Sequence, residues 1–340
     1  MWWWRTVGRV GKVAALGSCL SLGCAGGMPP PTVDAPSIDA GATLETMPVS
    51  GVGESVTLRF AWPDVLEGAC VRRVQRIERG RTTVSGTTSY RIRAERDGER
   101  IRITTFDVEG SGLGQPGLPP DTAVVVDVLD RNGRHLGVEG IEAAVAAMPG
   151  TESASAATRR MMVAGLRERL ARNWKLTLGA WVDRELPLGA AYVASAPEML
   201  ADGRSVNMRI LIQADGRVPC EPNSTVHDCV RLRFRSQPDD PRLDAWLPTL
   251  LRELMPRQAI DPSTVVLRTA IAETEVLVIT EPTTLIPHRF THRRHVALQA
   301  NSLEVPDIDR AMREDVTRVC RWRSSARGRR HARTPRPERR

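Results

Sequence analysis

The stretch Tyr90–Thr105, YRIRAERDGERIRITT, decides the fold class of this 340-residue chain. Apolar and charged side chains alternate on both sides of its central Asp97-Gly98 dipeptide. Asp-Gly favours a type I′ turn, because both central residues of that turn need positive φ. Folding about this turn sets Ala94 opposite Ile101, with apolar side chains on one face and arginines on the other. The sequence therefore predicts an antiparallel hairpin with one buried face.

Similar patterns recur along the rest of the chain. Asn132-Gly133 predicts a second hairpin, which sets Leu129 opposite Leu136. Alternation of apolar and polar residues is typical of half-buried strands. It predicts strands at residues 55–62, 208–212, 230–234, 264–271, 275–279 and 289–298.

Two helices are expected between these strands. Apolar side chains recur every four residues at Met162, Leu166, Leu170 and Trp174. This spacing predicts an amphipathic helix that packs on a sheet. A helix lying on a membrane surface is the alternative, and Glu168 on the polar face weakens it. A second helix is predicted to start at residues 239–241, Asp-Asp-Pro, and to end before Pro256.

The net charge of +8 comes from the two ends of the chain. Residues 1–24 carry three basic side chains and no acidic one, and residues 321–340 carry nine arginines and one glutamate. The remaining body has slightly more acidic than basic residues, so a nucleic-acid-binding face is not supported. The C-terminal segment contains little that is apolar, and we expect it to be a disordered Arg-rich tail.

The N-terminal segment has the organisation of an export signal. A basic region ends at Lys12, and residues 13–23 carry no charge. That stretch is too short for a membrane-spanning helix and is typical of a secretory signal peptide. Because the stretch ends at Cys24, residues 1–24 resemble a bacterial lipoprotein signal peptide, in which the cysteine after the cleavage site is lipidated.

The resemblance implies a lipid anchor, and two cysteines fit its position. Cys24 follows the longer uncharged stretch and is preferred, whereas Cys19 follows the more usual Leu16-Gly17-Ser18 box. A plain secretory signal cut near Ala25 is the third reading. The resemblance also implies the outer membrane, because neither candidate cysteine is followed by the aspartate that retains enteric lipoproteins at the inner membrane. Residues 25–54, rich in Pro, Gly and Ala, would then form a flexible tether.

Four further cysteines lie in the body, namely Cys70, Cys220, Cys229 and Cys320. An even number of cysteines in an exported protein predicts disulfides, and four cysteines allow three pairings. Cys220 and Cys229 flank a short loop and can close a hairpin, which leaves Cys70 and Cys320 to join the start and end of the body. A zinc site made by all four is disfavoured, because the chain has no Cys-x-x-Cys pair.

Chemistry-bearing motifs are scarce. The chain has no nucleophile elbow, His-Glu-x-x-His, P-loop or dinucleotide fingerprint, and we predict no cofactor. His288, His292 and His295 form the one cluster of metal-ligating residues, and His288 and His292 are weak metal or catalytic candidates. In a strand these two share a face, while His295 points to the other. Arginines interleave with them and would repel a cation, so we assign no metal or catalytic residue.

These elements together predict a β-rich α+β fold. Each antiparallel sheet is built from hairpins and is backed by one amphipathic helix. Two similar lobes are one way in which these sheets and helices can be arranged. Five segments follow along the chain: a lipoprotein-type signal peptide at 1–24, a flexible tether at 25–54, a β-rich lobe at 55–150, a helix with a second β-rich lobe at 151–320, and a disordered tail at 321–340.

The favoured function is that of a non-enzymatic lipoprotein, anchored in the bacterial envelope with its body in the periplasm or at the surface. It would bind a ligand, for instance an apolar molecule between sheet and helix, or an envelope protein partner. One alternative is an envelope hydrolase or metal-dependent enzyme that uses His288 and His292. Another is a structural scaffold that docks through the basic tail at 321–340.

Overall fold

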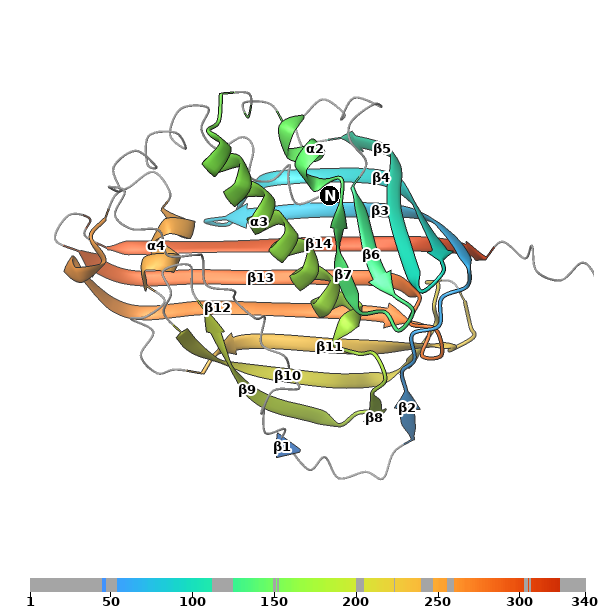
Figure 1. The fold of residues 1–340 in the computed structure, drawn as a ribbon. Coiled ribbons are helices and arrows are strands. Elements are labelled where there is room, and N and C mark those ends of the chain that lie inside the picture. Colours follow the sequence, from blue (N-terminus) through green and yellow to red (C-terminus); the bar gives the residue numbers. More distant parts are fainter. Residues whose placement is uncertain are drawn as a thin grey trace, which may run out of the picture.

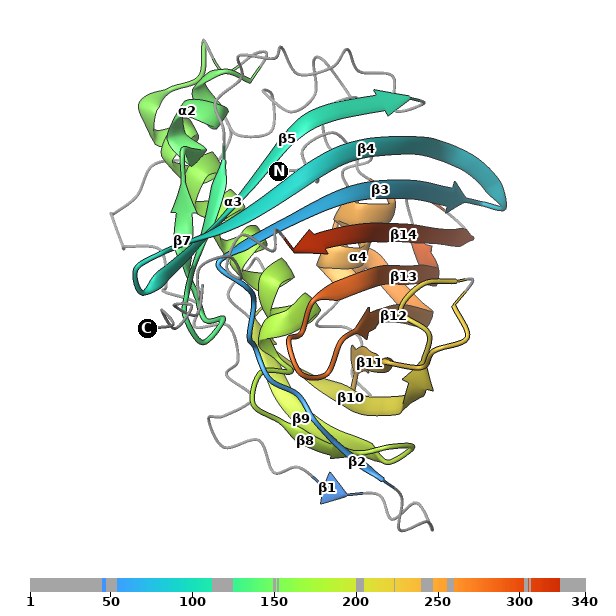
Figure 2. The ribbon, with the colours of Figure 1, turned by 90° about the vertical axis from the view of Figure 1, so that its right-hand side faces the viewer.

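The computed structural model describes residues 45–46, 54–111, 125–148, 151, 153–199, 205–222, 224–239, 247–255, 260–302, 305 and 307–324. Cys19, Cys24 and almost all of the predicted tether lie outside these ranges. Within them, one antiparallel sheet of 12 strands dominates, with the order β1-β9-β10-β11-β12-β13-β14-β3-β4-β5-β6-β7. Figure 2 shows that this sheet curves around the helices. We call the side that faces the helices the concave face and the opposite side the convex face.

The strands of this sheet are β1 (Glu45–Thr46), β3 (Val65–Glu78), β4 (Arg81–Asp97), β5 (Arg100–Ser111), β6 (Val126–Asp130), β7 (His135–Glu139), β9 (Ala191–Met199), β10 (Ser205–Val218), β11 (Cys229–Pro238), β12 (Val265–Thr280), β13 (Pro287–Ser302) and β14 (Ile308–Ser324). Two short strands, β2 (Ser55–Thr57) and β8 (Glu185–Pro187), pair with each other separately. The prediction of a β-rich fold with antiparallel sheets is confirmed.

The centre of the sheet is formed by strands from opposite ends of the body. β14 pairs with β3 from Met312 opposite Glu78 to Ser324 opposite Leu66. Because this pairing joins the earlier strands to the later ones, the two predicted lobes are not confirmed. Sequence reasoning did not predict β14. It extends to Ser324, four residues into the segment predicted to be a disordered tail.

The first predicted hairpin is present with a different turn. Asp97 pairs with Arg100, so Gly98 and Glu99 are the central residues instead of Asp97 and Gly98. Of the two, Gly98 alone has positive φ, at 59°, which suits a type II′ turn rather than type I′. The register moves by two residues, and Ala94 pairs with Ile103 instead of Ile101. A shift of two leaves every side chain on its predicted face, since strand side chains alternate with a period of two.

The second predicted hairpin also has a corrected register. Leu129 pairs with His135, whereas Leu136 is half exposed. The carboxylate of Asp130 accepts hydrogen bonds from the backbone N–H groups of Asn132 and Arg134, which folds the turn and creates an irregularity beside it. A one-residue slip therefore turns Leu136 away from the core.

Strand β12 takes the place of two strands that the sequence predicts separately, at residues 264–271 and 275–279. The sequence between 271 and 275 lacks apolar alternation, and this gap predicts a break. In the structure Ala272, Glu273 and Thr274 all pair with β13, so the strand runs unbroken for 16 residues. Pairing with β13 outweighs the weak local signal.

The helices lie together on the concave side (Figures 1 and 2). They are α2 (Ile141–Ala146), α3 (Ala156–Trp174), α4 (Leu247–Leu254), the π-helical turn η1 (Lys175–Gly179) and the 3₁₀ turn η3 (Pro262–Thr264). α3 begins where the Ser155 side chain accepts a hydrogen bond from the backbone N–H of Thr158, a standard N-cap. Among the described residues, none of these helices is long and apolar enough to span a membrane.

The described part of the chain contains two disulfides, between Cys70 and Cys320 and between Cys220 and Cys229. These are the pairs that the positions of the cysteines favoured. The first lies in the seam between β3 and β14, and the second bridges the connection from β10 to β11.

Candidate functional site

The concave face is apolar over much of its width. Every second residue of β10 to β13 points toward the helices. The buried apolar residues in these rows include Val206, Met208, Ile210, Ile212, Leu232, Phe234, Val276, Val278, Val296 and Leu298. They form one cluster with Leu250 and Leu251 of α4 and Leu178 of η1. A surface of this kind can bind an apolar molecule, and it can equally be a packed core.

Charged side chains interrupt this apolar surface on the two central strands. Arg72 on β3 and Glu314 on β14 are 5% and 4% exposed, although charged residues are seldom buried. Arg76 donates a 2.6 Å hydrogen bond to Glu314, which gives the buried carboxylate a partner. Burial lowers the pKa of Arg72, and the nearby Tyr90 and Glu314 oppose that shift. Sequence reasoning missed this group, because its members come from opposite ends of the body.

His292 lies on the same face of the sheet, between Phe290 and Arg294 in the inward-pointing row of β13. Burial lowers the pKa of His292, and the charge of Glu314 acts in the opposite direction. The imidazole is therefore held in its neutral form at neutral pH. Among the described residues, His292 belongs to no group with the spacing of metal ligands.

Aromatic side chains gather where α3 ends. The ring centroid of Trp62 lies 6.0 Å from that of Trp174 and 6.1 Å from that of Trp322. Trp174 donates its indole N–H to the carbonyl of Gly133 at 2.9 Å, and Trp322 donates to that of Pro287 at 2.7 Å. These hydrogen bonds fix the orientation of both rings. The cluster attaches the C-terminal end of α3 to the sheet.

The rest of α3 is attached much less firmly. Figure 1 shows the helix crossing in front of the sheet, yet none of its described side chains is fully buried. Leu166 and Leu170 pack against a small separate core near α2 and β7, and Met161 is 74% exposed. Two residues of the predicted apolar face thus contact the edge of the structure rather than the main core. The prediction that an amphipathic helix backs each sheet is not confirmed.

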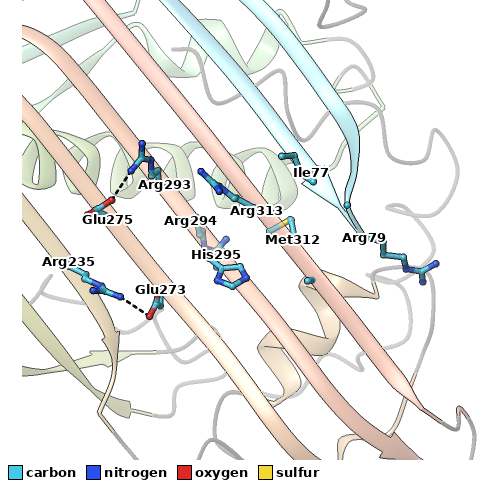
Figure 3. Close-up of a pocket in the computed structure, with 12 residues that line it drawn as sticks. Ile77, Arg79, Arg235, Glu273, Glu275, Arg293, Arg294, His295, Met312 and Arg313 are labelled. Atoms are coloured by element: carbon cyan, nitrogen blue, oxygen red, sulfur yellow. Dashed lines mark hydrogen bonds and ion pairs between the residues drawn. The ribbon is translucent and has the colours of Figure 1, made fainter.

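A groove of about 480 Å³ lies among charged side chains of the central strands (Figure 3). Its carboxylates are paired with arginines: Glu273 accepts from Arg235 at 3.0 Å, and Glu275 accepts from Arg293 at 3.3 Å. Since these residues alternate with the inward-pointing ones, they belong to the convex face. His295 also lines this groove.

His288 has different surroundings from the other two histidines. Its Nε2 lies 2.9 Å from a carboxylate oxygen of Glu281, and its side chain is 12% exposed. The hydrogen bond with His288 is the main reason why the pKa of Glu281 is lowered. His288 also lies beside the Cys220–Cys229 disulfide. The structure therefore does not bring His288, His292 and His295 into one site.

Comparison with known proteins identifies no family. No protein-family model matches the sequence, and no curated protein matches it. Among solved structures, a lipovitellin structure that describes lipid–protein interactions matches with a TM-score of 0.38 and 9% sequence identity. The match covers 77% of this chain and 26% of the lipovitellin chain, so this chain spans about a quarter of that structure. A likeness at this level carries no argument about function.

Proposed function

We propose that this protein is a non-enzymatic envelope lipoprotein that binds an apolar ligand between α3 and the concave face of its sheet. The observation that carries the proposal is the position of α3. It crosses the concave side, yet no described side chain of the helix is buried, and Met161 is largely exposed. Its attachment to the main core is at one end, through Trp174. Such a helix can move away from an aliphatic face at little energetic cost.

The exported, lipid-anchored location belongs to the same proposal. Two disulfides support it, because disulfides persist in oxidising compartments outside the cytoplasm. Lipidation at Cys24, or alternatively at Cys19, would anchor the chain, and residues 25–54 would hold the body away from the membrane. A protein partner in the envelope is the alternative occupant of the concave face.

Mass spectrometry of residues 25–340, exported to an oxidising periplasm without the lipid anchor, tests whether a ligand is carried. We expect extra mass in the native spectrum that disappears under denaturing conditions. The size of the lost mass gives the chemical class of the ligand. A native mass without any adduct moves the assignment to partner binding unless the purified chain then takes up an apolar probe.

Tryptophan quenching by a dibrominated fatty acid provides that probe and locates the site. Bromine quenches indole fluorescence at short range, and Trp62, Trp174 and Trp322 lie where α3 meets the sheet. We expect saturable quenching in the wild type and weaker quenching in Trp174→Phe. Trp181→Phe is the matched control, because Trp181 is fully buried in the core.

The result of the quenching experiment distinguishes an apolar ligand from a protein partner. An unbrominated fatty acid should compete with the brominated one without quenching. Absence of quenching together with an adduct-free native mass would exclude an apolar ligand. Equal loss of quenching in Trp174→Phe and Trp181→Phe would place the ligand elsewhere.

A further inference from the structure

We infer that Cys220, Cys229 and His288 form a site for a thiophilic metal ion, such as Zn²⁺, in the dithiol form of the protein. One ligand atom from each of the three residues lies within 4.8 Å of the others. In the structure the two cysteines form a disulfide, so the site exists when both thiols are free. The inference is independent of ligand binding at the concave face.

The orientation of His288 is that of a metal ligand. Its Nε2 is hydrogen-bonded to Glu281, whereas its Nδ1 is buried and has no hydrogen-bond partner among the described residues. In metal sites, a ligating histidine commonly gives its other ring nitrogen to a carboxylate, which fixes the tautomer and the ring plane. Nδ1 of His288 is therefore the free donor atom for a metal.

The carboxylate that orients His288 is itself held in place. Glu281 accepts a 2.8 Å hydrogen bond from the Thr284 hydroxyl, and its backbone N–H donates to the carbonyl of Ile286. The connection between β12 and β13 is thereby folded back on itself. A Thr284–Glu281–His288 chain of hydrogen bonds supplies the outer shell that a preorganised metal site needs.

The three donors suit zinc in type and in number. Zinc binds cysteine sulfur at about 2.3 Å and histidine nitrogen at about 2.0 Å, and three protein ligands leave one position open. Cys229 is fully buried at the start of β11, while Cys220 lies outside the sheet in the connection from β10. Once the disulfide is broken, Cys220 is the sulfur that can move away to make room for the ion.

The zinc-bound dithiol form converts to the disulfide form by a two-electron oxidation. A newly made chain carries both thiols, and Zn²⁺ binding releases their two protons. A small disulfide or a disulfide oxidoreductase then accepts two electrons from the two thiolates. The Cys220–Cys229 bond forms, the S–S bond of the acceptor breaks and its two sulfurs take up two protons from water to become thiols, and the zinc ion is released. The site would thus hold metal before oxidation and lose it afterwards.

Equilibrium dialysis against Zn²⁺ tests the inference on the mature chain, reduced with a phosphine. We expect one zinc per reduced chain and none per oxidised chain. Substitution of Co²⁺ should give a near-ultraviolet thiolate-to-cobalt band together with the visible bands of a tetrahedral site. Cys220→Ser keeps the Cys70 and Cys320 thiols, so loss of zinc in this variant assigns the site to Cys220 and not to the other pair.

Two histidine variants make a matched comparison. His288→Ala should weaken zinc binding at least tenfold, whereas His295→Ala, on the same strand but in the groove of the convex face, should leave it unchanged. Glu281→Gln should weaken it about 10–100-fold, as other outer-shell changes do. Equal zinc binding by oxidised and reduced chains, or by His288→Ala and wild type, would overturn the inference. If His288→Ala fails to fold, the cobalt spectrum of the wild type still decides, since absence of a thiolate band excludes the site.

Discussion

Cys70 on β3 lies directly opposite Cys320 on β14, and a disulfide joins the two residues with their Cα atoms 4.1 Å apart. They are separated by 250 residues in the sequence. The bond lies in the seam where the beginning and the end of the body meet in one sheet. It therefore fixes the register in which the two parts of the chain combine.

Removal of this disulfide should destabilise the protein strongly. In the chain-entropy model, a bond that closes a loop of 250 residues contributes about 5.5 kcal/mol, and one that closes 9 residues contributes about 2.6 kcal/mol. We expect Cys70→Ala with Cys320→Ala to lower the free energy of unfolding by more than Cys220→Ala with Cys229→Ala. Urea unfolding monitored by circular dichroism measures both. Equal losses would show that the seam is held without the bond.

Gly68→Ala should disturb the aromatic cluster. Gly68 pairs with Trp322, and a Cβ atom at Gly68 would lie 2.6 Å from the indole ring. The ring must shift, and we expect a loss of about 1–3 kcal/mol, as for other overpacked sites. Gly165→Ala on α3 is the control, because its Cβ would meet nothing and alanine favours helices. Unfolding midpoints and tryptophan emission should separate the two variants.

Stability should fall as the pH drops below about 6.5, the ordinary pKa of histidine. The pKa of His292 is lowered by burial, so the unfolded chain binds a proton that the folded chain resists. The contribution of His292 is complete above its unfolded pKa and is lost as pH falls toward its folded pKa. His292→Gln should flatten the dependence between pH 7.5 and 5 in urea titrations. An unchanged slope would assign the dependence to other groups.

Glu281 should cause a second loss of folding stability, at more acidic pH than the loss caused by His292. Its pKa is lowered from 4.5, chiefly by the hydrogen bond with His288. The stabilising contribution is present above the unfolded pKa and disappears as pH falls through the lower folded value. We expect Glu281→Gln to reduce the loss of stability below pH 4.5 while leaving the step at higher pH unchanged. Urea unfolding of this variant over the acidic range checks the assignment.

Hydrogen exchange should distinguish α3 from the central strands. The helix has no fully buried described side chain, whereas β13 pairs with β12 on one side and with β14 on the other along most of its length. We expect the amides of Ala156–Leu170 to exchange much faster than those of β13, with protection rising toward Trp174. Addition of a fatty acid that binds at the concave face should slow amide exchange in α3. Equal protection of helix and strands would show that α3 does not open.

The sequence predicted the alternating strands well and missed the seam, and the reason is visible in β3 and β14. Apolar residues of the concave face recur at every fourth position in β14, at Ile308, Met312, Val316 and Cys320. The positions between them carry charged residues, among them Glu314 and Arg318. The period of two is thereby lost, and a spacing of four is typical of a helix rather than a strand. The same holds for Leu66, Cys70 and Val74 in β3.

The surroundings of the histidines could not be predicted for a different reason. Alternation along one strand correctly separates His292 from His295, because it depends on local geometry alone. The position of His288 next to a disulfide depends on how β11, β12 and β13 pair and on the shape of the turn at Glu281–Ile286. These contacts are long-range, and no pattern within a single segment specifies them.

The position of β14 between β13 and β3 also has a consequence for the order of folding. β14 follows every other described strand in the sequence, yet it occupies an interior place in the sheet. Until it is made, β3 and β13 each present an unpaired edge, and exposed edges invite association between chains. A chain in which β14 has not yet paired is therefore open to association with another chain, and pairing of this one strand covers both edges at once.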